Sequence, residues 1–406
     1  LQAHPGHGAE QDGLAFAGSP RLGIATEACV VVIEAGCRLS MSVALRWCRT
    51  EDIDEATQAA WSDLGRRAPE PNPFATPEFV LPAARWLTPD RPTWVALIER
   101  HGDAGHELVG TGCFTEQRPD LFVPVPHLRS YQTLHTFRSG MLCSAGEATL
   151  VAQALMRFLA SQDKRWHAIA FQNLHADCPV LRSLQEQHVQ TRWFERHRFQ
   201  RPCLHVSTGL DYEDRLRASE RKDLQRRQRR LEERGSLHFR VLQGDAVDAS
   251  AMQTHLQLEH AGWKGKAGTS MLSAPAQVRF FVEMMERFRG TGGAVIAETL
   301  CDGDVIASTS NLLLGDTLNG FKTGWHPGFA AMSPGRLNEL HLFRQMPTSW
   351  PGVTTFDSQS QEDSYLADLL PDRRAMITGT LTTDTLGGLA MRAARLIRPL
   401  AYRLER

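Results

Sequence analysis

The clearest pattern of apolar and polar positions lies between Gly293 and Gln345. Three strand-like runs follow one another there, over residues 294–301, 305–314 and 317–325. The first two are joined by Asp302-Gly303, a dipeptide that suits a tight hairpin because both residues tolerate left-handed backbone angles. Apolar residues then recur at helical spacing at Leu337, Leu340, Phe343 and Met346. The pattern predicts three consecutive antiparallel strands followed by a helix.

The start of this helix predicts an anion site. The segment reads Ser333-Pro334-Gly335-Arg336, in which Ser is a good N-cap and Pro fits the first helical position. A helix entered directly from a strand leaves the N–H groups of Gly335, Arg336 and Leu337 free to bind a phosphate, and the arginine adds a positive charge. The alternative is an ordinary capped helix with a surface arginine.

The first half of the chain repeats this order. A strand over 43–49 precedes helical patterns at 53–64 and 77–87, strands at 93–100 and 107–115, and a longer extended region that reaches residue 137. A helix at 147–160, a strand at 166–172 and a helix at 179–190 complete it. At the loop equivalent to Ser333–Arg336 the first copy has Glu147, whose carboxylate would repel a phosphate. A phosphate-bearing ligand is therefore expected in the second half.

These patterns predict an α/β fold with a mixed sheet and two similar domains in tandem. The expected segments are a disordered or non-native extension (1–40), an N-terminal domain (41–205), a basic linking helix (206–235), a C-terminal catalytic domain (236–380) and a basic amphipathic tail (381–406). Met41 is the expected natural start, because the regular pattern begins there.

The linking helix is strongly basic, with nine Lys or Arg against four Asp or Glu over residues 215–234. One interpretation is a surface that binds a polyanion such as RNA, a nucleotide-linked donor or a lipid head group. The other is a solvated linker whose inner stripe is Leu216, Leu224 and Leu231. The tail at 386–406 likewise predicts either a helix on an anionic membrane surface or one packed on the domain.

The composition of the chain excludes some classes of protein. The formal net charge of −1 excludes a globally basic nucleic-acid binder. The sequence contains no run of 18 apolar residues, so no membrane span is predicted. The eight cysteines are scattered, without metal-ligand spacing, so we expect reduced thiols, no metal and a cytoplasmic location, with membrane contact limited to the inner face.

Three motifs carry a resemblance to a known family: HAGWKGKAGTS (260–270), NGFKTGWHPGFAAMSPG (319–335) and TTFDSQ (354–359). With the order of elements, they resemble the GNAT-like acetyltransferases of the CelD/BcsL type, bacterial proteins related to the Fem-type aminoacyl transferases. The resemblance runs from about residue 46 to 380 and is densest after Ser219. It departs after Lys322-Thr323, where relatives often carry Tyr-Asp and this chain has Trp325-His326.

The resemblance implies a site between the strands at 317–325 and 353–358. Acetyl-CoA or another acyl-CoA would lie there, held by Phe321, Thr323, Ser333, Gly335, Arg336 and Leu337. Lys322 would bind donor or substrate, Asp357 would be the general base, and His326 is the alternative base. The pair Trp263 and Lys264 would line the acceptor pocket. Each residue also has a structural alternative: an edge-strand lysine, a turn-capping aspartate, a loop histidine and a core tryptophan.

Three functions follow. The first is transfer of an acyl group, by expectation acetyl, to an amine or hydroxyl of a cell-envelope or polysaccharide precursor, either a small molecule or a lipid-linked one. The second is aminoacyl transfer from charged tRNA, in which the basic helix would bind RNA. The third is a non-catalytic accessory protein of polysaccharide biosynthesis.

Overall fold

The computed structural model describes residues 29–34, 42–102, 105–161, 165–186, 191–206, 212–383, 385 and 387–392. The basic tail predicted over 386–406 lies largely outside these residues. Within the extension predicted over 1–40, Cys29–Glu34 forms strand β1, which pairs antiparallel with β2 (Ser42–Arg49).

The two halves repeat one order of elements. In the first half the order is β2 (Ser42–Arg49), α1 (Glu55–Arg67), α2 (Pro77–Trp86), β3 (Trp94–Gly102), β4 (Gly105–Gln117), β5 (His127–Ser130), β6 (Met141–Cys143), α3 (Ala148–Ser161), β7 (Ala168–His175), α4 (Pro179–Glu186) and β8 (Thr191–His205). After α5 (Ala218–Glu232), the second half has β9 (Leu237–Gln243), α6 (Ala249–Ala261), α7 (Trp263–Lys266), α8 (Pro275–Gly290), β10 (Ala294–Cys301), β11 (Asp304–Leu314), β12 (Thr317–Trp325), α9 (Pro334–Ser349), β13 (Thr355–Asp357), α10 (Leu366–Leu369) and β14 (Asp372–Thr383). The tandem arrangement predicted from the sequence is confirmed.

Local chemistry explains much of this repetition. The first long helix of each half starts at an aspartate N-cap: Asp54 accepts from the N–H of Thr57 and Asp248 from that of Ala251, both at 2.8 Å. The β10–β11 hairpin turns at Asp302 and Gly303, whose φ angles of 51° and 91° are the left-handed values that this dipeptide favours. These short-range signals fix where helices and strands begin.

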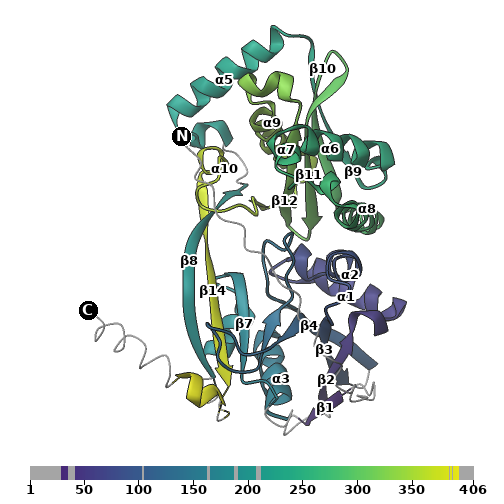
Figure 1. The fold of residues 1–406 in the computed structure, drawn as a ribbon, viewed down its shortest axis with the longest axis vertical. Coiled ribbons are helices and arrows are strands. Elements are labelled where there is room, and N and C mark those ends of the chain that lie inside the picture. Colours follow the sequence, from purple (N-terminus) through teal and green to yellow (C-terminus); the bar gives the residue numbers. More distant parts are fainter. Residues whose placement is uncertain are drawn as a thin grey trace, which may run out of the picture.

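All the strands form one sheet, and each half lends its last strand to the other. The order is β1-β2-β3-β4-β5-β7-β14-β8-β13-β12-β11-β10-β9, with β6 also paired to β4. Strand β8, which ends the first half, pairs with β13, while β14, from the end of the second half, pairs with β7. The two exchanged strands pair antiparallel with each other from Thr191–Thr383 to Cys203–Asp372. Figure 1 shows them side by side, joining the lower half to the upper half.

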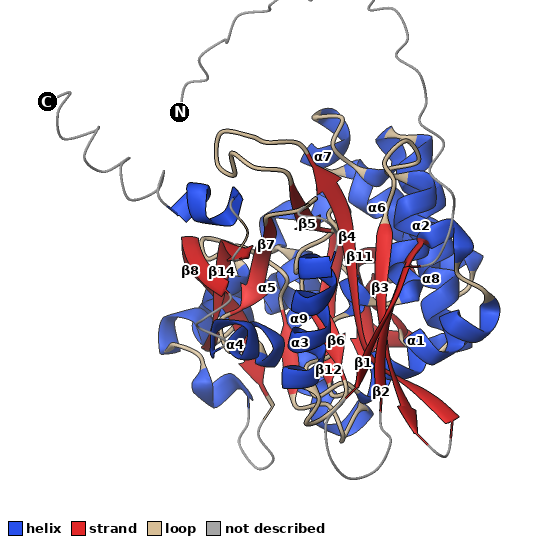
Figure 2. Ribbon diagram, turned by 90° about the horizontal axis from the view of Figure 1, so that it is seen from below, coloured by secondary structure: helices blue, strands red, loops and turns tan. Residues whose placement is uncertain are grey.

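Helices cover both faces of the sheet (Figure 2). One face carries a core that spans both halves. In this core Phe79 of α2 packs edge to face on Phe280 of α8, with the ring centroids 5.4 Å apart. On the other face, α3 and α9 each cover a separate core. None of the helices in the described ranges is long and apolar enough to cross a membrane. The halves are therefore joined by an exchanged strand pair and a shared core.

Candidate functional site

The site predicted from the sequence lies where β12 and β13 part. These parallel strands pair only from Thr317–Thr355 to Asn319–Asp357, whereas β12 continues to Trp325. Beyond Asn319 the loop after β13 still lies close, since Gln359 Nε2 donates to Asn319 Oδ1 at 2.9 Å. From Phe321 onward, no strand of the described residues pairs with this edge of β12. An extended ligand could use the N–H and C=O groups of that edge.

A β-bulge marks the same place. The β11–β12 register passes from Asn311–Gly320 to Ser310–Lys322, so Phe321 is the extra residue. A bulge redirects the side chains that follow it and is often found beside active sites. Here it coincides with the position of Lys322.

Lys322 is a largely buried lysine without an ion pair among the described residues. Its Nζ lies over the rings of Phe137 and Phe321, 5.3 and 5.6 Å from their centroids. Burial and the charge of Lys264 lower the pKa of Lys322 from 10.5 to about 8. A substantial fraction of this amine is therefore neutral near physiological pH, which a surface lysine would not be.

Charged and polar groups from both halves surround Lys322. Lys264, at the start of α7, lies 3.2 Å from Glu259 and donates to the carbonyl of Thr323 at 3.3 Å. His135, from the first half, contacts Gln277 at 3.1 Å, and burial with the charge of Lys322 lowers its pKa to about 3. His255 contacts Ser308 Oγ at 2.9 Å, and burial with the charge of Lys264 lowers its pKa to about 3 as well. Each imidazole is neutral and has a buried nitrogen without a partner among the described residues.

The N-terminus of α9 does not match the expectation of a Ser333 cap with free N–H groups at Arg336 and Leu337. Ser333 does not cap it through its side chain; it has φ 50°, and its Oγ accepts from Arg227 at 2.8 Å. The N–H groups of Arg336 and Leu337 both point to the carbonyl of Ser333. Gly335 packs on the end of β12, where a Cβ would lie 3.3 Å from Trp325 and 3.4 Å from Thr323. The first turn of α9 therefore lies directly above the unpaired part of β12.

Both helix starts that were compared by charge carry ion pairs. Arg336 pairs with Glu220 of α5, and Glu147, before α3, pairs with Arg100. A phosphate at α9 would have to compete with Glu220 for the guanidinium. The contrast between the halves is thus weaker than the isolated residues indicate.

Asp357 does not have the surroundings of a general base. Its carboxylate is buried, 3.3 Å from His175 Nε2 and 3.7 Å from Arg201 Nη1, and it accepts from the N–H of Gln359 at 3.1 Å. Burial alone would raise its pKa, but Arg201, His175 and Arg138 together hold that pKa well below the usual range. A carboxylate held ionised this strongly is a poor proton acceptor, so the geometry favours a structural role that links the halves.

The remaining predicted residues have mixed positions. His326 is exposed and turned onto its own loop, where Nδ1 accepts from the N–H of Gly328 at 3.2 Å. Phe321 and Leu337 are buried in the cores of the two opposite faces, so only their backbones could meet a ligand. Trp263 begins α7, but its side chain lies outside the described residues. The structure thus gathers Lys322, Lys264 and Thr323 and separates them from His326.

Glu339 was not foreseen as a site residue. Its Oε1 accepts from Thr323 at 3.2 Å and from the hydroxyl of Tyr365 at 2.7 Å, while Oε2 is buried without a partner among the described residues. Burial raises the pKa of Glu339 to about 7, against the effect of those hydrogen bonds. The i, i+4 spacing from Gly335 was the available sequence signal, because it places both residues on one face of α9. The contribution of His135 had no such signal, since it comes from the other half.

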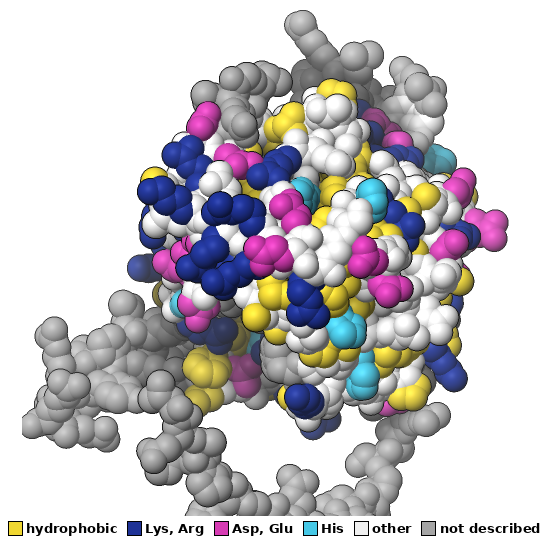
Figure 3. All heavy atoms as spheres, turned by 90° about the horizontal axis from the view of Figure 1, so that it is seen from above, with side chains coloured by type: hydrophobic (Ala, Val, Ile, Leu, Met, Phe, Trp, Pro, Cys, Tyr) yellow, Lys and Arg dark blue, Asp and Glu magenta, His cyan; other side chains and the backbone are white. Residues whose placement is uncertain are grey.

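Two further features bear on partners. No group of three His, Cys, Asp or Glu side chains in the described part of the chain is suited to a metal ion. Leu224 and Leu231 of α5 and Leu216, which lies just before it, are buried as predicted, whereas Arg226, Arg229 and Arg230 are exposed. Figure 3, seen from the end where α5 lies, shows Lys and Arg side chains gathered on one side. A role of this surface in binding RNA or a membrane stays a prediction.

Residues 218–365 match the family model described as an acetyltransferase (GNAT) domain. Among solved structures, FemX is similar with a TM-score of 0.54 and 10% identity, covering 83% of this chain and 98% of FemX. A conserved protein of unknown function from Bacteroides thetaiotaomicron has a TM-score of 0.52 and 9% identity, covering 82% of this chain and 98% of that protein. A tandem GNAT protein from the clavulanic acid biosynthesis pathway has a TM-score of 0.40 and 16% identity, covering 84% of this chain and 98% of that protein. No curated protein sequence matches the chain. The chain thus has a mixed α/β fold of two units with the same order of elements, similar in fold to FemX, and its second unit matches the acetyltransferase (GNAT) domain over residues 218–365.

Proposed function

We propose that the second half transfers an acyl group from acyl-CoA to an amine or hydroxyl. The observation that carries this proposal is Lys322: a largely buried amine with a lowered pKa, at a bulge, beside the unpaired edge of β12. The match of residues 218–365 to an acetyltransferase domain supports it. The finer assignment to the CelD/BcsL type stays a prediction.

Lys322 suits a proton relay. The neutral amine accepts a proton from the acceptor's amine or hydroxyl as that group attacks the thioester carbonyl. The new C–N or C–O bond forms, the C–S bond breaks, and the Lys322 ammonium returns the proton to the leaving thiolate. A pKa of about 8 suits both steps, because it lies near the operating pH and near the value of about 8.5 of an ordinary thiol.

The donor's position follows from β12 and α9. The pantetheine arm would pair with the edge of β12 beyond Asn319, which no described strand pairs with. The backbone N–H groups of β12 along this edge would stabilise the oxyanion that forms on the thioester carbonyl. The diphosphate would lie at the start of α9 and take Arg336 from Glu220. Thr323 of β12 and Glu339 of α9 are hydrogen-bonded to each other and would form the wall of the site between these two elements.

The acceptor would enter on the face where both halves meet. His135 and Phe137 of the first half lie close to Lys322, so the first half shapes this pocket. We infer an acceptor of the cell-envelope or polysaccharide type, since its hydroxyls or amines would find a polar partner in Lys264, whose side chain is 24% exposed. The test is release of the CoA thiol from acetyl-CoA with a panel of amino sugars and sugars. Release that depends on an acceptor supports the proposal, whereas release only with a charged tRNA as the donor would favour aminoacyl transfer.

Glu339→Gln should change the pH dependence of stability. Its folded pKa of about 7 lies above the unfolded value of 4.5, so the wild type loses stability as pH rises between these values. Glutamine cannot ionise and keeps the shape. We expect the variant to gain about 1–3 kcal/mol over the wild type at pH 8 and much less at pH 5, measured by urea unfolding. The exposed Glu286→Gln on α8 is the control, and an equal gain at both pH values would contradict the assignment.

A further inference from the structure

The outer side of α5 carries positive charge that its neighbours do not balance. Its inner side is fixed in the core of the second half by Leu224 and Leu231. Arg226 and Arg227 share the single carboxylate of Asp223. Five further cations at or beside the helix are exposed and have no ion pair with a carboxylate among the described residues: Arg217, Lys222, Arg229, Arg230 and Arg234. The helix therefore keeps an excess of positive charge.

Most of these cations lie in one row, called here the basic row. It consists of residues at i, i+4, i+7 and i+8 of the helix: Lys222, Arg226, Arg229 and Arg230. At 3.6 residues per turn these positions face away from the buried leucines, and the row is about 12 Å long at 1.5 Å per residue. Acidic residues of the segment lie elsewhere. Glu220 pairs with Arg336 of α9, and Glu232 and Glu233 follow the row at the end of the helix.

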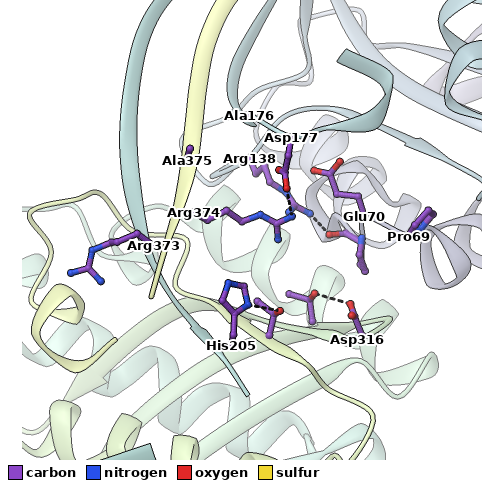
Figure 4. Close-up of a pocket in the computed structure, with 13 residues that line it drawn as sticks. Pro69, Glu70, Arg138, Ala176, Asp177, His205, Asp316, Arg373, Arg374 and Ala375 are labelled. Carbon is purple, nitrogen blue, oxygen red and sulfur yellow. Dashed lines mark hydrogen bonds and ion pairs between the residues drawn. The ribbon is translucent and has the colours of Figure 1, made fainter. Parts of the chain in front are cut away.

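The arginines between the two halves are matched, in contrast to the basic row. Figure 4 shows a cavity of about 490 Å³ there, in which Arg374 lies 3.7 Å from Asp177. Arg138 lies close to the carboxylate of Glu70, and Arg373 points away from the cavity. Apart from Asp223, the basic row has no such carboxylates beside it, so its charge is available to a partner from outside.

A loop without charge lies beside the basic row. It is the turn η6 (Pro327–Met332), which reads PGFAAM and has no polar side chain. Arg227 of α5 donates to the carbonyl of Ala331 at 3.3 Å. Arg234 lies over the ring of Phe329, 5.5 Å from its centroid. Four of the six residues of η6 are exposed, so the surface combines a row of cations with exposed apolar residues.

We propose that the basic row and η6 together bind the surface of an anionic lipid bilayer. The cations attract acidic head groups, and the apolar loop enters the boundary between head groups and acyl chains. Figure 3 shows that Lys and Arg side chains gather on one side of this end of the molecule. Single-stranded RNA fits less well, because the basic row has no aromatic side chain on which bases could stack and Phe329 lies under Arg234.

The turn η6 also connects this surface to the acyl-transfer site. It joins the end of β12 to the start of α9. A bilayer on this surface would lie next to the proposed donor site, which favours a lipid-linked acceptor over a soluble one. The choice of acceptor rests on the proposed function, whereas binding of the bilayer does not.

Vesicle flotation of the full chain tests the binding. Vesicles of phosphatidylglycerol and phosphatidylcholine in equal parts should carry the chain with them, and vesicles of phosphatidylcholine alone should not. Near an anionic surface each Lys or Arg contributes about fivefold in affinity, so Arg229→Gln with Arg230→Gln should weaken binding by about 25-fold. Ala330→Asp, which adds a negative charge to η6, should weaken it too. The matched control is Arg157→Gln with Arg182→Gln, two exposed arginines on α3 and α4.

The proposal is overturned if the anionic vesicles do not carry the chain, if phosphatidylcholine alone carries it equally well, or if the control pair loses as much affinity as the α5 pair. Unchanged binding of the α5 pair or of Ala330→Asp overturns it as well. Binding of an RNA homopolymer in place of the vesicles would assign the basic row to RNA. Flotation needs no acyl donor, so a chain that floats but releases no CoA thiol contradicts only the proposed function.

Discussion

Lys322→Met should lower acceptor-dependent turnover by about 10²–10⁴-fold and leave acetyl-CoA affinity unchanged. Methionine keeps the length and the contact with the rings of Phe137 and Phe321, but it can neither accept nor return a proton. Stability should not fall, because the variant removes a largely buried charge without an ion pair among the described residues. Steady-state kinetics with calorimetric binding of acetyl-CoA separate the two effects.

Two companion variants distinguish a proton relay from a simple positive charge. Lys322→Arg keeps the charge but does not lose its proton, so it should be nearly as inactive as Lys322→Met. Lys264→Met removes the neighbouring charge that helps to lower the pKa of Lys322, so the pH at half-maximal rate should move upward from about 8. The exposed Lys266→Met is the control for both. High activity of Lys322→Arg would show that the lysine acts only by charge.

Asp357→Ala should destabilise the folded chain by about 3–5 kcal/mol at pH 7. The substitution leaves Arg201 buried without its carboxylate partner and removes one of the two carboxylates that contact His175. The pKa of Asp357 is lowered in the folded state, so its contribution is present above the unfolded value of 3.8 and is lost as pH falls below it. Urea unfolding at neutral and acidic pH should show the two proteins converging on the acidic side.

The same variant separates this role from general-base catalysis. A base replaced by Ala would abolish turnover with little loss of stability, which is the opposite pattern. Asp177→Ala is the matched control, because its carboxylate is exposed and its only ion pair among the described residues, with Arg374, is long at 3.7 Å. Unchanged unfolding of Asp357→Ala would contradict the structural role.

The sequence predicted the elements whose signals are local. Strands β10 and β12 have the predicted bounds, because Asp302-Gly303 and Gly315-Asp316 are turn signals next to them. The repeat was visible because each half has the same order of periodic segments. Residues 218–365, which match the acetyltransferase domain, include all three motifs that carried the resemblance.

The sequence did not predict the exchanged strands. Strand β8 reads TRWFERHRFQRPCLH and lacks a regular alternation of apolar and polar residues. It is stabilised by backbone pairing with β14 and β13, which are distant in the sequence, so its own residues carry little signal of a strand. The surroundings of Asp357 were hidden for the same reason, since His175 and Arg201 reach it from the first half. Lys322 could be singled out because a mid-strand charge is unusual, but its lowered pKa depends on burial that only the fold creates.

We expect acyl-CoA to bind along β12 with its phosphates at the start of α9. Calorimetric titration with acetyl-CoA tests it on the wild type and on the double variant Arg336→Glu with Glu220→Arg, which keeps the ion pair but reverses the charge at the helix start. We predict one acetyl-CoA per wild-type chain and at least about tenfold weaker binding to the charge-swapped variant, at equal melting temperature. Equal affinity in the two proteins, or no binding to the wild type, would contradict it.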